Sequence, residues 1–348
     1  MWYLDYYDYP EYLHTTPAYM EGWETHPVPK SVWHVTRGGV VMGPLRGREV
    51  PFKILPPLEA GWRREHRLVA VSQSNDFSMG LCSCGKVFID GYLYWSDYER
   101  KSEMVGWKDV AALATGPETV LALRKDGRVL APGYKKSAPF FSWCNIVQLS
   151  VGESAKLGLC EDGTVRAVGD ECIEREVASW HDIVQVSAGD KYVLGVRSDG
   201  TVAYADVGYE EYACDVSGWT DIVQVSAGPY HVAGLRRDGT VVVAECEMYW
   251  EFMEDVACLD VGEWQDVTQV CAGNGITAAL RADGWVLVAV SAGEHAGERV
   301  EVPFGAVAIS VNRHYEGNDE VLALDAQGHA FSGLVSFEGL PWDNWNAE

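Results

Sequence analysis

Residues 180–205 read WHDIVQVSAGDKYVLGVRSDGTVAYA, and residues 219–244 read WTDIVQVSAGPYHVAGLRRDGTVVVA. These stretches are two copies of one unit, and weaker or degenerate copies precede and follow them. Units start near residues 62, 107, 143, 180, 219, 264 and 304, so that neighbouring starts lie 36 to 45 residues apart. A repeat of this length is typical of proteins in which each unit forms one blade of a propeller.

The pattern within a unit predicts β-strands. In DIVQVSAG, the Ile, Gln and Ser side chains fall on one side and Val, Val and Ala on the other, with small residues where strands crowd a central axis, so we expect the innermost strand here. Two β-rich runs follow, joined at an Asp-Gly pair, which favours a hairpin whose two turn residues both adopt positive φ. A variable stretch, such as Cys214 to Trp219, is expected to add a fourth, outer strand. Five units carry the pair, at Asp126-Gly127, Asp162-Gly163, Asp199-Gly200, Asp238-Gly239 and Asp283-Gly284.

Such small sheets cannot bury both faces alone, so they must stack side by side and close into a ring. The sequence therefore predicts an all-β fold, a single seven-bladed β-propeller over residues 31–348, preceded by a Tyr-rich, acidic arm at residues 1–30. Residues 33–61 are a partial repeat, and Val35 to Gly43 resembles a hairpin that closes the ring. The alternative is eight blades, one of them partial and completed by the C-terminal segment. The recurrent tryptophans are expected to pack between blades.

Composition limits the partners that we expect. The chain has 27 Lys and Arg against 51 Asp and Glu, a formal charge of −24 that repels nucleic acid. The N-terminus has no signal-peptide pattern and no run of 18 apolar residues occurs, so we expect no membrane partner and a cytoplasmic location. Nine cysteines without a compact framework predict reduced thiols.

The phased pattern V-x-V-S-A-G, then Tyr or His, then R-x-D-G-T-V resembles the regulator of chromosome condensation repeat family. In style it is closest to short bacterial repeats, such as those of the propeller-type β-lactamase inhibitor proteins. The resemblance runs from about Val35 to Trp342, and it implies a propeller that displays loops to a protein partner. Two departures stand out: the family's usual His survives only near His231, and its Gly-x-Asn-x-x-Gly-Gln run is missing. The nucleotide-exchange activity of some members is therefore not transferred.

Motifs that carry catalysis do not appear in the sequence. There is no Gly-rich phosphate loop that opens a helix, no H-E-x-x-H and no G-x-S-x-G. Cys82-Ser83-Cys84 falls where other units place their hairpin turn, so a degenerate turn is favoured over half of a metal site. We expect no enzyme activity, no cofactor and no metal.

Candidate partner-binding residues lie in two kinds of variable segment. Aromatic clusters in the connections have no role in the repeat, although they can also pack on outer strands or under the arm. The short links that follow the innermost strands vary while their flanks do not; at His231, a packed structural histidine is the favoured interpretation. The predicted function is a non-catalytic protein-interaction module, and the alternative is a small-ligand receptor or enzyme that uses the central channel. The candidate residues are Tyr92, Tyr94, Trp95 and Tyr98 in one cluster, Tyr249, Trp250 and Phe252 in the other, and Asp190, Lys191, Tyr230 and His231 in the links.

Overall fold

The computed structural model describes most of the repeat region. It covers residues 68–73, 77–91, 103–104, 106–116, 119–133, 138–208, 213–246, 257–291, 299–303, 305–311, 321–326 and 330–333, together with four two-residue strands between residues 34 and 49. The predicted anchors near 62 and 304 and the arm at 1–30 lie outside these residues.

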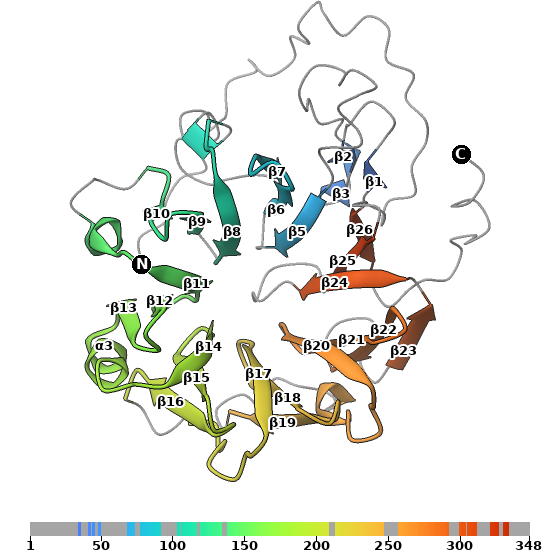
Figure 1. Cartoon of the computed structure of the whole chain (residues 1–348). Coiled ribbons are helices and arrows are strands. Elements are labelled where there is room, and N and C mark those ends of the chain that lie inside the picture. The colour runs from blue at the N-terminus through green and yellow to red at the C-terminus, as the bar shows by residue number, and fades with distance from the viewer. Residues whose placement is uncertain are drawn as a thin grey trace, which may run out of the picture.

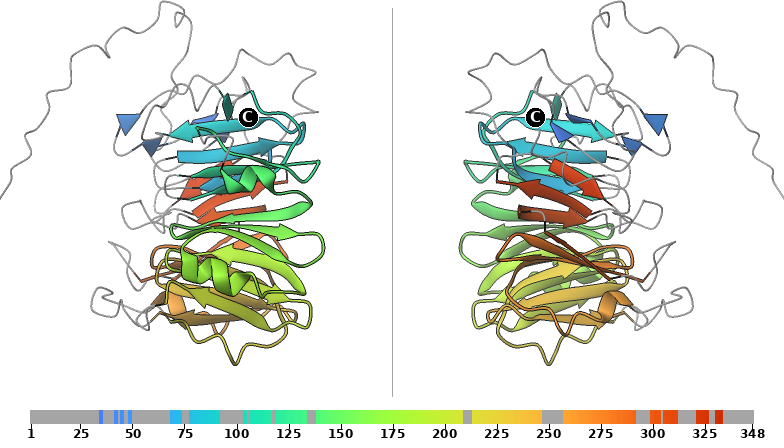
Figure 2. Two further views of the ribbon diagram at one scale, coloured as in Figure 1. Left: turned by 90° about the vertical axis from the view of Figure 1, so that its left-hand side faces the viewer. Right: turned by 90° about the vertical axis from the view of Figure 1, so that its right-hand side faces the viewer.

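Within the described residues, seven antiparallel sheets of three or four strands are arranged around one axis, and we number them blades 1 to 7 in chain order (Figure 1). The strands run from one face of the ring to the other (Figure 2). The predicted all-β propeller is confirmed. The blades are β5 (Leu68–Gln73), β6 (Phe77–Cys82) and β7 (Val87–Gly91); β8 (Val110–Thr115), β9 (Val120–Arg124) and β10 (Val129–Leu130); β11 (Ile146–Val151), β12 (Ala155–Cys160) and β13 (Val165–Gly169); β14 (Ile183–Ala188), β15 (Tyr192–Arg197) and β16 (Val202–Asp206); β17 (Ile222–Ala227), β18 (His231–Arg236) and β19 (Val241–Glu245); β20 (Val267–Ala272), β21 (Ile276–Arg281), β22 (Trp285–Val290) and β23 (Arg299–Pro303); and β24 (Ala306–Val311), β25 (Val321–Asp325) and β26 (Ala330–Gly333).

The core consists of apolar clusters between neighbouring blades. Leu68 of blade 1 packs with Leu322 and Leu324 of blade 7, which joins the last described blade to the first. Trp180 is buried between blades 3 and 4, as predicted for the repeated tryptophans. A Cβ atom at Gly195 would lie 2.9 Å from the Trp180 ring, so the glycine makes room for the indole. Trp143 and Gly158, and Trp219 and Gly234, repeat this contact in the blades on either side.

The Asp-Gly hairpins are confirmed, but the predicted turn type is wrong. Within the Asp-Gly pair of blade 3, Gly163 has a positive φ, of 80°, and Asp162 does not. The Gly163 N–H donates to Cys160 O at 3.0 Å, and Cys160 N–H donates to Thr164 O at 2.8 Å, which closes a three-residue loop. The Asp162 carboxylate accepts hydrogen bonds from the Thr164 hydroxyl and N–H, and they lower the pKa of Asp162. The aspartate thus stabilises the turn through its side chain.

The outer connections also differ from prediction. The stretch from Cys214 to Trp219 does not form an outer strand; Cys214 makes a single antiparallel bridge with Cys246. The same two residues form a disulfide, so the expectation of reduced thiols is wrong for this pair. Elsewhere the described connections contain α3 (Glu171–Val177), which begins at the side-chain cap of Asp170, and the 3-10 turns η1 (Pro139–Ser142) and η4 (Ala257–Leu259).

The partial repeat contains the predicted hairpin. The strands β1 (His34–Val35) and β2 (Val41–Met42) pair antiparallel, and a second short pair, β3 (Pro44–Leu45) and β4 (Arg48–Glu49), follows. β1 lies beside β26 of blade 7 (Figure 1). This position suits a piece that closes the ring between the last blade and the first.

Candidate interaction face and central channel

The ring has two faces that differ in what they expose. We call one the hairpin face, because the Asp-Gly hairpins lie there together with the start of each innermost strand. The other is the link face, where the short links join the innermost strand of each blade to its middle strand. In Figure 1 the strands that lie nearest the axis are the innermost strands β5, β8, β11, β14, β17, β20 and β24.

On the link face, neighbouring blades approach each other closely. A Cβ atom at Gly152 would lie only 2.0 Å from Gly189 O, and one at Gly189 would lie 2.8 Å from Gly228 O. The Tyr192 hydroxyl donates to Gly228 O of the next blade at 2.6 Å. Ser154 N–H also donates to Asp190 O across a blade boundary, at 3.0 Å. These contacts confirm that small residues crowd the axis at this end of the strands.

Two of the link residues predicted to contact a partner are buried, which corrects that prediction. Asp190 is 4% exposed and His231 is 0% exposed. Lys191, which forms an ion pair with Glu153 at 2.9 Å, and Tyr230 are partly exposed and stay candidates. The aromatic candidates Tyr92, Tyr94, Trp95, Tyr98, Tyr249, Trp250 and Phe252 lie outside the described residues.

His231 has a structural environment. Thr277 donates its hydroxyl to Cys258 O at 2.6 Å, so its oxygen accepts from His231 Nε2–H at 2.8 Å. Burial lowers the pKa of His231 to about 4, because the charged imidazolium would lose its hydration. The ring is therefore neutral at physiological pH, as a packed histidine is expected to be.

The hairpin face carries a ring of exposed side chains that the sequence interpretation missed. The second residue of every innermost strand is the extra residue of a β-bulge. A bulge re-aims its side chain and interrupts the alternation of the strand. Five of the seven are valines with 38% to 54% of their surface exposed, and Ala111 and Thr268 are exposed as well. We call Val69, Val147, Val184, Val223 and Val307 the valine ring.

Charges of both signs surround the valine ring. Asp182 and Asp221, both exposed and both with positive φ, stand two residues before Val184 and Val223. Arg197, which is partly exposed, pairs across the hairpin with the first residue of β14. An apolar centre within a polar, mixed-charge border is the usual composition of a protein interface.

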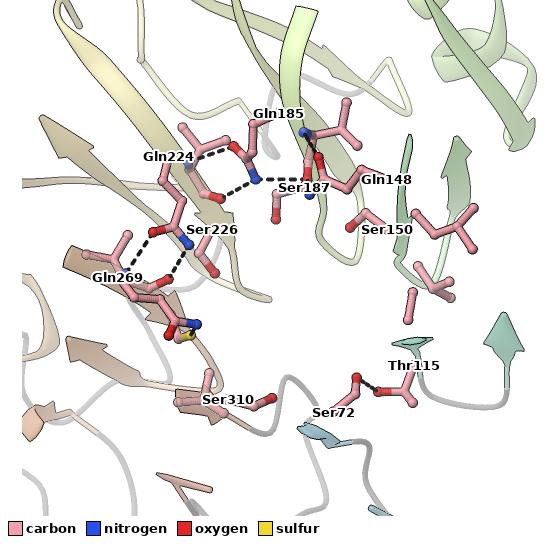
Figure 3. Close-up of a pocket in the computed structure, with 18 of the residues that line it drawn as sticks. Ser72, Thr115, Gln148, Ser150, Gln185, Ser187, Gln224, Ser226, Gln269 and Ser310 are labelled. Atoms are coloured by element: carbon pink, nitrogen blue, oxygen red, sulfur yellow. Dashed lines mark hydrogen bonds between the residues drawn. The ribbon is translucent and has the colours of Figure 1, made fainter. Parts of the chain in front are cut away.

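A cavity of about 190 Å³ lies on the axis, lined by the innermost strands of all seven blades (Figure 3). Its lining residues carry aliphatic, hydroxyl and carboxamide side chains, together with the thiol of Cys271. None of these lining residues is an acid, a histidine or a basic residue. The described part of the lining therefore offers hydrogen bonds from uncharged side chains.

Four glutamines bridge neighbouring blades inside this cavity. Gln148 accepts from Val186 N–H at 2.9 Å and donates to Val186 O at 3.1 Å, so one carboxamide pairs with both backbone groups of one residue. We call this arrangement a glutamine clasp. Gln185 and Gln224 repeat it on Val225 and Val270 of the next blade (Figure 3). Gln269 repeats it on Ile309, and the distances in these three clasps are 2.8 to 3.2 Å.

A second row of polar contacts reinforces the clasps. Ser150 accepts from Ala188 N–H at 2.9 Å, and Ser187 and Ser226 accept from the equivalent residues of the following blades. The repeated Gln-x-Ser pattern in the sequence was the available signal for these contacts. These Gln and Ser side chains form hydrogen bonds with backbone groups of the next innermost strand, which is the edge of its sheet and has no neighbouring strand to pair with them.

The Cys82-Ser83-Cys84 segment forms the hairpin turn of blade 1, as predicted. Cys82 N–H donates to Lys86 O and Gly85 N–H donates to Cys82 O, both at 2.8 Å. Burial, with a smaller contribution from Cys84, raises the pKa of the Cys82 thiol to about 11. Within the described residues, no group of three or more His, Cys, Asp or Glu side chains is placed to hold a metal ion. No helix in the described part of the chain has the length and apolarity that a membrane span requires.

Comparison with known proteins supports the fold. No family model matches the sequence, and no curated protein matches it. Among solved structures, the chain is similar to Prp20p from Saccharomyces cerevisiae, with a TM-score of 0.55 and 15% identity over 88% of this chain and 92% of that one. It is also similar to human WBSCR16, with a TM-score of 0.54 and 15% identity over 87% and 97% of the two chains. A third is the CRINKLY WD40 ectodomain of the Arabidopsis thaliana receptor kinase ACR4, with a TM-score of 0.51 and 17% identity over 64% and 80%. At these identities the shared feature is the propeller fold.

Proposed function

We propose that this protein is a non-catalytic protein-interaction module that docks a partner protein on its hairpin face. The observation that carries the proposal is the valine ring, which a bulge in each innermost strand exposes around the axis. Repeated bulges that present apolar side chains to solvent favour a surface that another protein covers.

Covering the exposed side chains of the valine ring would release enough free energy for specific binding. Full burial of a valine side chain contributes about 1.5–3 kcal/mol, so covering the exposed half of one contributes on the order of 1 kcal/mol. Five such residues offer on the order of 5 kcal/mol before the entropy cost of association. The charged border then adds orientation and partner selection.

The similar structures and the repeat pattern also support this proposal. The report on Prp20p concerns its binding to Gsp1p and histones, and yeast RCC1 (Prp20) has been crystallised with Kap60. The pattern that resembles the regulator of chromosome condensation repeat supports protein binding by this chain as well. The formal charge of −24 favours a protein partner over nucleic acid. We retain a cytoplasmic location as part of the proposal, together with a contribution from the aromatic insertions around Trp95 and Trp250.

The cavity supports the second candidate function, small-ligand binding, more than it supports catalysis. Its hydroxyl and carboxamide groups donate and accept hydrogen bonds, whereas general acid–base catalysis needs groups that titrate near the working pH. We therefore propose that any small molecule in the channel is bound and released unchanged.

Affinity purification with a matched pair of variants tests the docking face. Val147→Glu/Val184→Glu places two negative charges in the valine ring. Arg175→Glu changes the net charge by the same amount on an exposed position of α3. We expect the wild type and Arg175→Glu to capture the same partner and the double variant to lose it while keeping the wild-type circular dichroism spectrum. Equal capture by all three proteins would show that the hairpin face is not the interface.

A further inference from the structure

The glutamine clasp is missing from one continuous arc of the channel. Alanine takes the place of glutamine in blades 7, 1 and 2, at Ala308, Ala70 and Ala112. The strand register confirms the equivalence, since Ala112 is opposite Leu123 just as Gln148 is opposite Leu159. A methyl group has no donor or acceptor, so these three blades have no clasp for the blade that follows.

The backbone groups that a clasp would hold are nevertheless present. Val186, which Gln148 clasps, is opposite Gly195 in its sheet, and its N–H and C=O point away from that neighbour. Leu149 has the same position opposite Gly158, and Leu113 and Val71 have it in blades 2 and 1. The N–H and C=O of these three residues therefore face the channel next to an alanine.

Space is available beside them. Val71, Leu113 and Leu149 all line the axial cavity of about 190 Å³. Each alanine directly follows a bulge residue that is exposed on the hairpin face, as Ala70 follows Val69 and Ala308 follows Val307. The open arc thus begins immediately below the valine ring.

We propose that this arc binds a primary carboxamide, which pairs with Leu149, Leu113 or Val71 as the protein's own glutamines pair with Val186 and its equivalents. The ligand oxygen accepts the backbone N–H, and the ligand NH₂ group donates to the C=O of the same residue. The source is either the Asn or Gln side chain of an inserted protein segment or a free small amide. This inference does not depend on the proposed function, because it is tested with small probes alone.

The site distinguishes an amide from a carboxylate. The described residues that line the cavity include no cation to compensate a negative charge, so a carboxylate would lose hydration without a partner there. Its second oxygen would also face the backbone carbonyl, with which it cannot form a hydrogen bond. A Gln-containing probe should therefore bind where the otherwise similar Glu-containing probe does not.

The test is an NMR titration of protein labelled with ¹⁵N-leucine and ¹⁵N-valine. Acetamide is one probe, and the capped tripeptide Gly-Gln-Gly, with Gly-Glu-Gly as its control, is the other. We expect saturable shifts of the Leu113, Leu149 or Val71 amide signals, while Val186 and Val225, already clasped, serve as references within the same spectra. The Ala112→Gln variant should lose the response of Leu149 because its own side chain then occupies the position.

Each outcome is decisive. A stronger response to Gly-Gln-Gly than to acetamide supports an inserted protein side chain as the source, and a response to acetamide alone supports a free small amide. If the three signals shift no more than Val186 and Val225 with either probe, or if the Glu peptide acts as strongly as the Gln peptide, the proposal is overturned. The wild-type titration decides this even where Ala112→Gln does not fold.

Discussion

Removal of one glutamine clasp should measurably lower the stability of the propeller. Gln185 accepts from Val225 N–H at 2.8 Å and donates to Val225 O at 3.0 Å and Val186 O at 2.9 Å. At about 1 kcal/mol for each lost hydrogen bond, Gln185→Ala should cost about 3 kcal/mol. Unfolding entropy of about 2.1 cal/mol/K per residue gives about 0.7 kcal/mol/K for the chain, so the melting temperature should fall by about 4 °C.

Differential scanning calorimetry at neutral pH measures this shift. Gln265→Ala is the control, because Gln265 is exposed on the hairpin face beside Trp264, and it should leave the melting temperature within 1 °C of wild type, a shift of less than about 0.7 kcal/mol. Ala112→Gln should change stability in the opposite direction, since it supplies a clasp for Leu149. The reasoning is refuted if Gln185→Ala and Gln265→Ala melt together.

Three further expectations follow from the buried contacts. Gly195→Ala should lower stability by about 1–3 kcal/mol in thermal melts because its Cβ meets the Trp180 ring, while Gly218→Ala, with nothing within 4 Å, should not. Because the pKa of His231 is lowered in the folded state, its imidazole binds a proton between pH 6.5 and about 4 in the unfolded chain but not in the folded chain. The contribution of neutral His231 to the free energy of unfolding, on the order of 3 kcal/mol, is therefore present above pH 6.5 and is lost toward pH 4. In denaturant titrations at pH 7 and 4.5, the free energy of unfolding should fall less in His231→Gln than in the wild type. The Cys214–Cys246 disulfide predicts seven reactive thiols in unreduced, denatured protein, and nine would contradict it.

The blade architecture was readable from the sequence because each unit repeats the same physical requirements. An indole needs a glycine opposite it, so Trp180 and Gly195 recur together as Trp143 and Gly158 do. Each hairpin needs one residue with positive φ, so the glycine of the Asp-Gly pair recurs as well. These requirements act within one unit or between adjacent units, and a single sequence displays them by repetition.

The candidate site was less readable, because its features depend on register and on contacts between blades. Strict alternation assigned Val184 and Val186 to the same side, whereas the bulge exposes Val184 and leaves Val186 buried. The variable links suggested exposure at Asp190 and His231, but the approach of neighbouring blades near the axis buries both. Pairing of Cys214 with Cys246 depends on how a connection folds back on β19, which spacing alone does not reveal.

Hydrogen–deuterium exchange of the protein with and without its captured partner tests the docking of that partner on the hairpin face most directly. The account predicts that bound partner slows exchange in peptides covering residues 145–149, 182–186 and 221–225, where the bulges lie. Peptides covering residues 152–155, 189–192 and 228–231 on the link face should exchange as in the free protein. Protection confined to these link-face peptides would contradict it.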